Sequence, residues 1–184
     1  MLTPDFTPFP VIETKRLVLR KILKEDAAEL FKLRSSELVM QYIDRPIHKT
    51  IQDTEKLISI ITELLEKNDG INWGITLKDN PVLIGNICLF NLQKEHYRGE
   101  LGYLLTPEYY RKGIMNESIE AVINYGFETM KLHSIEAQVN PENTPSINIL
   151  EKNKFVREAY FKESRYHKGK FVDFAIYSRL NPNN

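Results

Sequence analysis

The sequence predicts an α/β (α+β) fold built on one mixed sheet with helices on its faces. Two observations lead to this prediction. Segments in which apolar and polar residues alternate recur along the 184 residues, and segments of helical periodicity separate some of them but not others. Strands that follow one another directly pair antiparallel, whereas a helix between two strands allows them to run parallel. The sheet is therefore expected to contain both kinds of pairing.

The elements are expected in the order β α α β β β α β α β β. Residues 1–12 contain three prolines and are interpreted as an extended lead-in, and Pro145 is expected at the first helical position behind a Thr144 cap. Strands are expected at 16–20, 73–77, 82–91, 100–105, 135–139, 155–167 and 171–180, and helices at 25–34, 51–67, 117–130 and 146–153. Because no linker or repeat interrupts them, residues 1–184 are expected to form a single domain with a short tail at 181–184.

The first two helices are expected from the periodicity of their residues. The repeating face of the first helix consists of Ala27, Leu30, Phe31 and Arg34, at the i, i+3, i+4 and i+7 spacing of one helix side. The second helix carries an apolar stripe and stops at Asn68-Asp69-Gly70.

The composition excludes several classes of protein. Lys plus Arg and Asp plus Glu balance at 25 each, which argues against a dedicated nucleic-acid binder but leaves room for a local site for a phosphorylated ligand. The single cysteine, Cys88, allows no internal disulfide, and its use fits a reducing compartment. The N-terminus resembles no secretory signal, and no apolar stretch reaches the ~18 residues of a membrane span, so the chain is expected to be cytoplasmic. No metal site is expected, because the histidines and Cys88 lack metal-ligand spacing.

The segment 100–117 carries the strongest chemical signal. It predicts a strand, a loop with a basic pair, and then a helix, with Asn116 as a suitable helix cap. Backbone N–H groups at a helix start are unpaired and lie at the positive end of the helix dipole, so they bind anions. Gly113 lets the backbone approach a phosphate closely, and Arg111 and Lys112 add positive charge. The alternative is a tight turn at Gly113 with a solvated basic pair.

Several other residues have two interpretations. Gly102 lies inside an apolar strand and indicates either a bulge beside a cleft or a glycine beneath a bulky aromatic. Cys88 is interpreted as a small core residue, and His48 as a surface histidine or a substrate-site residue. The aromatic residues of the last two strands are expected to pack along them rather than to stack on nucleic acid: Tyr160, Phe161, Tyr166, Phe171, Phe174 and Tyr177.

Two motifs in the right order and spacing resemble the GNAT superfamily of N-acetyltransferases, and within it the ribosomal-protein alanine/serine acetyltransferase branch. ELGY at 100–103 followed by YRKGIMNE at 110–117 is similar to the family's strand and pyrophosphate loop. NPENTPS at 140–146, leading to LEKNKF at 150–155, is similar to its second cofactor segment. The resemblance extends from ETKRLVLR at 13–20 to DFAIYS at 173–178, nearly the whole chain.

The resemblance implies a mixed, mostly antiparallel sheet that splays at an acetyl-CoA cleft and has helices on both faces. It also implies a set of cofactor-binding residues. The backbone of three strand residues would pair with the pantetheine amides: Tyr103, Leu104 and Leu105. The backbone of six loop residues would hold the pyrophosphate: Arg111, Lys112, Gly113, Ile114, Met115 and Asn116. Asn143 would bond the pantetheine arm, with Ser146 close to it.

The chain also departs from the family at three positions. The family usually has glycine or alanine at the position of Met115. It usually has glycine at the position of Lys154. Leu150 stands where related enzymes often have a tyrosine that protonates the leaving thiolate, so no residue is assigned to that role.

Acetyl transfer requires an acceptor for the ammonium proton, and Glu100 is the candidate. It lies two residues before Gly102, on the same face of the strand; the alternative is a surface carboxylate paired with Arg98 or another neighbour. Backbone N–H groups near Leu104 are the expected oxyanion donors.

The favoured acceptor is a protein or peptide N-terminal α-amine. An α-amine has a pKa of about 7.7–8.0 and a lysine amine one of about 10.4, so roughly a tenth of the former is neutral at pH 7 against about 0.04% of the latter. Residues 42–51 are expected to line the acceptor side. Small amines, amino acids or antibiotics are the alternative acceptors. The alternative function is a catalytically silent CoA-binding sensor. The sequence also leaves open whether the protein forms a homodimer.

Overall fold

The structure is a computed structural model that describes residues 1–167 and 169–183. Within those residues one eight-stranded sheet has the order β1-β2-β3-β4-β5-β6-β8-β7. All neighbouring strands pair antiparallel except β5 and β6, which run parallel, and this confirms the mixed, mostly antiparallel sheet. The strands are β1 Ile12–Glu13, β2 Leu17–Lys21, β3 Ile71–Leu77, β4 Asn80–Gln93, β5 Arg98–Leu105, β6 Ser134–Val139, β7 Val156–His167 and β8 Lys170–Leu180.

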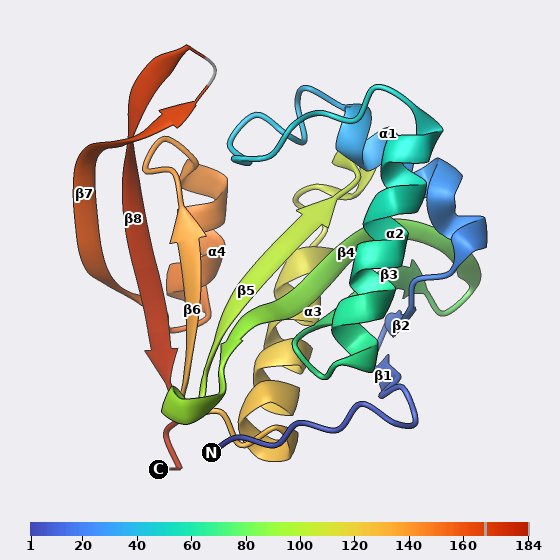
Figure 1. Ribbon diagram of the computed structural model, residues 1–184, viewed down its shortest axis with the longest axis horizontal. Coiled ribbons are helices and arrows are strands. Elements are labelled where there is room, and N and C mark those ends of the chain that lie inside the picture. The colour runs from blue at the N-terminus through green and yellow to red at the C-terminus, as the bar shows by residue number, and fades with distance from the viewer. Residues whose placement is uncertain (168, 184) are drawn as a thin grey trace.

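Helices cover both faces of the sheet, as expected. The helices α1 (Ala27–Ser35) and α2 (Ile51–Glu66) lie on the face turned toward the viewer in Figure 1, and α3 (Ile114–Asn124) and α4 (Thr144–Lys152) lie behind it. The larger core, which includes Trp73, packs α3 and α4 against the sheet, and a smaller cluster packs α1 and α2 against the other face. None of the described helices is long and apolar enough to cross a membrane.

The lead-in has a structural role. Leu2 and Phe6 are buried in the larger core, and the indole N–H of Trp73 donates to the carbonyl of Pro10 at 2.7 Å. The lead-in also contains the short strand β1, whose pairing with β2 the sequence pattern did not reveal.

The sheet divides between β5 and β6. These strands pair at three positions only, Arg98 with Ser134, Gly99 with Ile135 and Glu100 with Glu136. Beyond Glu100, β5 continues beside β4 to Leu105, and β6 continues beside β8 to Val139. Figure 1 shows the two strands diverging like the arms of a V, with β1 to β5 on one side and β6, β8 and β7 on the other. The splayed sheet is therefore confirmed.

Candidate active site

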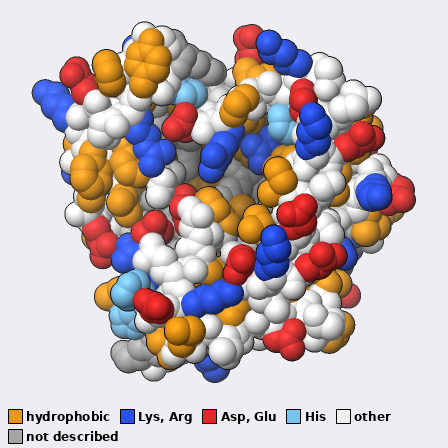
Figure 2. Space-filling model, viewed as in Figure 1, with side chains coloured by type: hydrophobic (Ala, Val, Ile, Leu, Met, Phe, Trp, Pro, Cys, Tyr) orange, Lys and Arg blue, Asp and Glu red, His pale blue; other side chains and the backbone are white. Residues whose placement is uncertain are grey.

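A cleft of about 830 Å³ lies where the sheet divides. Its walls come from both halves of the sheet and from the α1 and α2 side, and Figure 2 shows the hollow in the middle of this face. The Arg, Asp, Glu and His side chains that line it are Arg34, Asp44, Arg45, Glu100, Arg165, His167 and Asp173. Its deeper part is lined by the polar residues Asn72, Asn86 and Cys88 and by β5 residues 100–104.

Glu100 is buried at the point of divergence, with 8% of its surface exposed. Its Oε2 accepts a 2.8 Å hydrogen bond from Asn91 Nδ2. Burial raises the pKa of the Glu100 carboxyl, and the charge of Glu136 adds to this, against the opposing effects of Asn91, Arg165 and Arg45. A general base works best when its pKa lies near the working pH, so this environment suits a proton acceptor. The alternative pairing with Arg98 is wrong, because the Arg98 guanidinium binds Glu136 at 2.7 and 2.8 Å.

The position of Asn91 results from a β-bulge. The register between β4 and β5 shifts between Phe90 and Gln93, so that two residues of β4 face Gly99 alone, and Asn91 has a φ of 47°. The bulge predicted near Gly102 is wrong, since Gly102 pairs regularly with Cys88. A Cβ at position 102 would lie 3.2 Å from the Phe90 ring, which confirms the glycine-beneath-an-aromatic alternative.

Cys88 lines the cleft instead of lying wholly in the core, so its assignment as a core residue is wrong. Its Sγ donates to the carbonyl of Gly102 at 3.5 Å, and burial raises the pKa of the thiol to about 12. A cysteine nucleophile acts as the thiolate, so Cys88 at neutral pH is unsuited to an acyl-enzyme step.

The predicted pyrophosphate loop has the backbone of an anion site. Gly113 is the N-cap of α3 with a φ of 75°, and Arg111 also has a positive φ, 59°. The first N–H groups of α3 follow directly and have no partner within the helix. Arg111, Lys112 and Gly113 are exposed, whereas the side chains of Ile114 and Met115 are buried in the larger core. The backbone therefore forms the surface that a ligand would meet.

Both predicted helix caps are wrong. Asn116 lies in the first turn of α3, where its Oδ1 accepts from Asn153 Nδ2 at 3.1 Å, because Gly113 already begins the helix. Helix α4 is capped by Asn143, whose Oδ1 accepts from the Ser146 N–H at 3.2 Å, and Thr144 is its first residue.

Two predicted cofactor residues meet across the gap. Tyr103, on β5, and Ser146, in the first turn of α4, share a 2.7 Å hydrogen bond between their hydroxyl groups. Burial raises the pKa of Tyr103 to about 12, so the phenol is protonated at neutral pH. Leu104 and Leu105 continue β5 along the gap, beyond its last pairing with β6. Leu150 is fully buried in the core and offers nothing to the cleft.

Residues 16–156 match the family described as the acetyltransferase (GNAT) domain, which is more than half of the chain. The chain belongs to the GNAT acetyltransferase family. This GNAT protein is therefore an acyltransferase of the N-acetyltransferase type, and the resemblance seen in its motifs is confirmed.

The GNAT assignment holds over nearly the full length. The uncharacterized N-acetyltransferase YoaA of Bacillus subtilis is 34% identical over 95% of this chain and 98% of its own. A GNAT-family acetyltransferase from Bacillus anthracis matches with a TM-score of 0.82 and 32% identity over 94% of this chain and 99% of its own. A ribosomal L7/L12 α-N-protein acetyltransferase in complex with coenzyme A has a TM-score of 0.86 over 95% of this chain and 100% of its own; at 18% identity it supports the fold alone. A spermidine N(1)-acetyltransferase of Vibrio cholerae is 23% identical over 86% of this chain and 89% of its own.

Sequence reasoning missed the contacts that support the predicted pyrophosphate loop. Glu117, in the first turn of α3, accepts hydrogen bonds from the hydroxyl of Thr14 at 2.6 Å and from the backbone N–H and Nε of Arg16 at 2.9 and 2.7 Å. Arg16 also donates from Nη1 to the carbonyl of Lys112 at 2.8 Å. Burial acts to raise the pKa of Glu117, but these hydrogen bonds outweigh it and lower that pKa.

Glu117→Gln is expected to weaken CoA binding by about fivefold and to lower the free energy of unfolding by about 1–2 kcal/mol, because it breaks charge-assisted hydrogen bonds to Arg16. Since a lowered pKa adds stability that is lost as the pH falls through it, the difference from the parent protein should shrink on acidification. Calorimetry and urea unfolding at several pH values measure both effects. The exposed Glu120→Gln on the same helix is the control, and equal losses in both variants would contradict the prediction.

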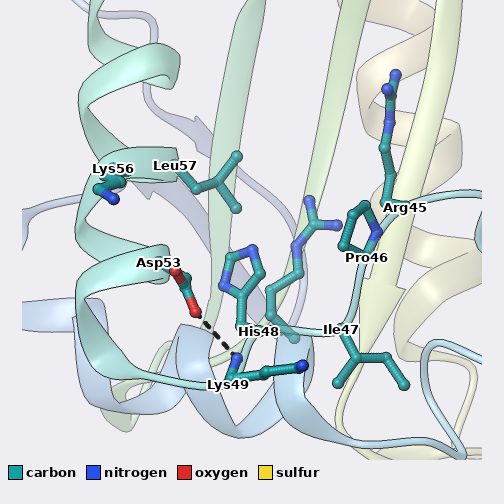
Figure 3. A pocket seen from close by; sticks show the side chains of 9 residues that line it. Arg45, Pro46, Ile47, His48, Lys49, Asp53, Lys56 and Leu57 are labelled. Atoms are coloured by element: carbon teal, nitrogen blue, oxygen red, sulfur yellow. Dashed lines mark hydrogen bonds between the residues drawn. The ribbon is translucent and has the colours of Figure 1, made fainter.

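The loop between α1 and α2 divides into two parts. Tyr42, Ile43, Asp44 and Arg45 line the cleft, and the role of residues 42–51 on the acceptor side stays a prediction. The rest of the loop, with His48, lies at a neighbouring hollow of about 450 Å³, shown in Figure 3, which Arg34 and Arg45 also line. His48 Nδ1 lies 2.8 Å from the hydroxyl of Thr54, and burial and the charge of Arg34 lower the pKa of His48.

Within residues 1–167 and 169–183 no group of three or more His, Cys, Asp or Glu is placed to hold a metal ion.

Proposed function

We propose that this protein transfers the acetyl group of acetyl-CoA directly to a primary amine, most of all to a protein or peptide N-terminal α-amine. Acetyl-CoA supplies the activated thioester. The inner edges of β5 and β6 offer backbone groups to the pantetheine arm, and residues 111–116 offer N–H groups to the pyrophosphate. In this proposal, Asn143 and Ser146 at the start of α4 contact the pantetheine arm from the side opposite β5.

The observation that supports this proposal best is Glu100, a buried carboxylate at the point where the sheet divides. As the amine nitrogen bonds to the thioester carbonyl, backbone N–H groups near Leu104 stabilise the oxyanion, and Glu100 accepts the ammonium proton, directly or through water. The carbonyl then re-forms, the C–S bond breaks, and CoA leaves as a thiolate that takes a proton from solvent. The thiol state of Cys88 favours direct transfer over a covalent acyl-enzyme.

The experiment is thiol release from acetyl-CoA across peptides beginning with Ala or Ser, free amino acids and polyamines. Release with the peptides would support the proposal. Release with polyamines alone would show that the acceptor is a polyamine and not an α-amine. Tight CoA binding by calorimetry without release for any amine would favour a CoA-binding sensor. Absence of CoA binding would contradict both.

A further inference from the structure

Arg34, near the end of α1, lines both the cleft and the neighbouring hollow, where it adds a positive charge. Its Nε is buried without a hydrogen-bond partner among the described residues, and no ion pair to those residues engages its guanidinium. Burial, together with the nearby charge of Arg45, lowers its pKa. A largely buried cation without a partner costs free energy, so this position is explained best if a ligand supplies an acceptor to the guanidinium group.

The carboxylates of the cleft are already engaged. Asp44 lies 3.6 Å from Arg165 and 3.5 Å from the Nδ1 of His167. Asp173 accepts hydrogen bonds from the hydroxyl of Tyr160 and the backbone N–H of Glu163.

Arg165 is engaged as well, since it donates to Gln138 at 2.9 Å and lies 3.8 Å from the centre of the Phe174 ring. Arg45 is exposed at the mouth of the cleft, and neither a hydrogen bond nor an ion pair joins its side chain to another described residue. Among the described residues, Arg34 and Arg45 are thus two cleft cations that no carboxylate binds in an ion pair, and Figure 2 shows Lys and Arg side chains gathered at this rim.

We propose that the amine acceptor carries a carboxylate, and that Arg34 and Arg45 bind it while Glu100 faces the amine. This inference rests on the proposed function and narrows its substrate class. A guanidinium presents planar donors that match a carboxylate, and it repels a second ammonium group. A polyamine would place its extra positive charges against these two arginines, so it fits this cleft poorly.

The test compares acceptors that differ only in one carboxylate. Ala-Asp-Ala-amide against Ala-Asn-Ala-amide tests a side-chain carboxylate, and Ala-Ala against Ala-Ala-amide tests a terminal carboxylate, each corrected for the neutral fraction of its amine. The expected result is a kcat/KM about tenfold higher for the acid in at least one pair. In Arg34→Gln the acid-to-amide ratio should fall about tenfold, and in Arg45→Gln, on an exposed loop, it should fall in the same direction.

Lys56→Gln is the matched control, because Lys56 is an exposed cation that lines only the neighbouring hollow. It should leave the ratio unchanged. If amines are acetylated but the ratio is near one in the parent protein, or is the same in Arg34→Gln, the inference is overturned and the proposed function stands. If no amine is acetylated, the proposed function itself fails.

Discussion

Glu100→Gln is expected to lower turnover about a hundredfold or more while CoA binds with unchanged affinity. Glutamine keeps an oxygen that accepts the hydrogen bond from Asn91, but it cannot take the proton of the attacking amine. Steady-state kinetics with the best acceptor and calorimetry with CoA measure the two effects. Turnover within about threefold of the parent protein would remove Glu100 from the mechanism.

The pH profile separates a base from a merely structural carboxylate. Activity corrected for the neutral fraction of the amine should rise with pH through the raised pKa of Glu100, and this acidic limb should be absent in Glu100→Gln. Glu136→Gln is the matched comparison, because it removes a neighbouring charge that raises the same pKa, so its limb should move to lower pH. The raised pKa also means that the stability contribution of the Glu100 carboxyl is lost as the pH rises through it. Glu100→Gln should therefore be no less stable than the parent protein at pH 8.

Gly113→Asp is expected to weaken CoA binding about a hundredfold or more. Gly113 has a positive φ at the start of α3, where unpaired N–H groups point outward, and a carboxylate there would occupy the anion site and repel the pyrophosphate. Aspartate tolerates this backbone conformation better than most residues, so the charge dominates the effect. Calorimetry with CoA gives the affinity.

A second glycine supplies the control for backbone strain. Gly169, in the turn between β7 and β8, has a φ of 87°, and a Cβ there would meet nothing within 4 Å. Gly169→Asp imposes the same backbone requirement away from the loop and should leave CoA affinity unchanged. Equal weakening of CoA binding in both variants would show that the loss of affinity in Gly113→Asp comes from backbone strain and not from charge repulsion.

The strands and helices were predictable because their periodicity reflects burial on one face, and the GNAT motifs indicated where the sheet divides. Features that depend on distant partners were not predictable. Glu117 looks like an ordinary first-turn carboxylate until the fold brings Thr14 and Arg16 beside it, about a hundred residues away in sequence. The positive φ of Arg111 and the bulge at Asn91 are backbone conformations that those residue types do not require.

Two differences have a local cause. The helix predicted over 117–130 begins three residues earlier because Gly113 caps it, and after Asn124 it continues as a π-helical turn over Tyr125–Thr129. Among the aromatics expected to pack along the last strands, Phe161 stacks on Phe174, and Tyr166 packs edge-to-face against Phe171 with ring centres 5.3 Å apart, although both of the latter are 65% exposed. The sequence places Arg34 on the repeating face of the first helix. Only the structure shows that this face brings the arginine to the cleft.

Because β5 and β6 pair at only three positions, this sheet has four edges instead of two. Two are the outer strands β1 and β7. The other two lie where the strands diverge, along 101–105 of β5 and 137–139 of β6, and present to the cleft peptide groups that pair with no neighbouring strand. A slender molecule with amides spaced along its length would be received there as a missing strand. Its binding would join two sheet halves that are otherwise barely connected, so amide hydrogen exchange along both inner edges should slow together when CoA is bound.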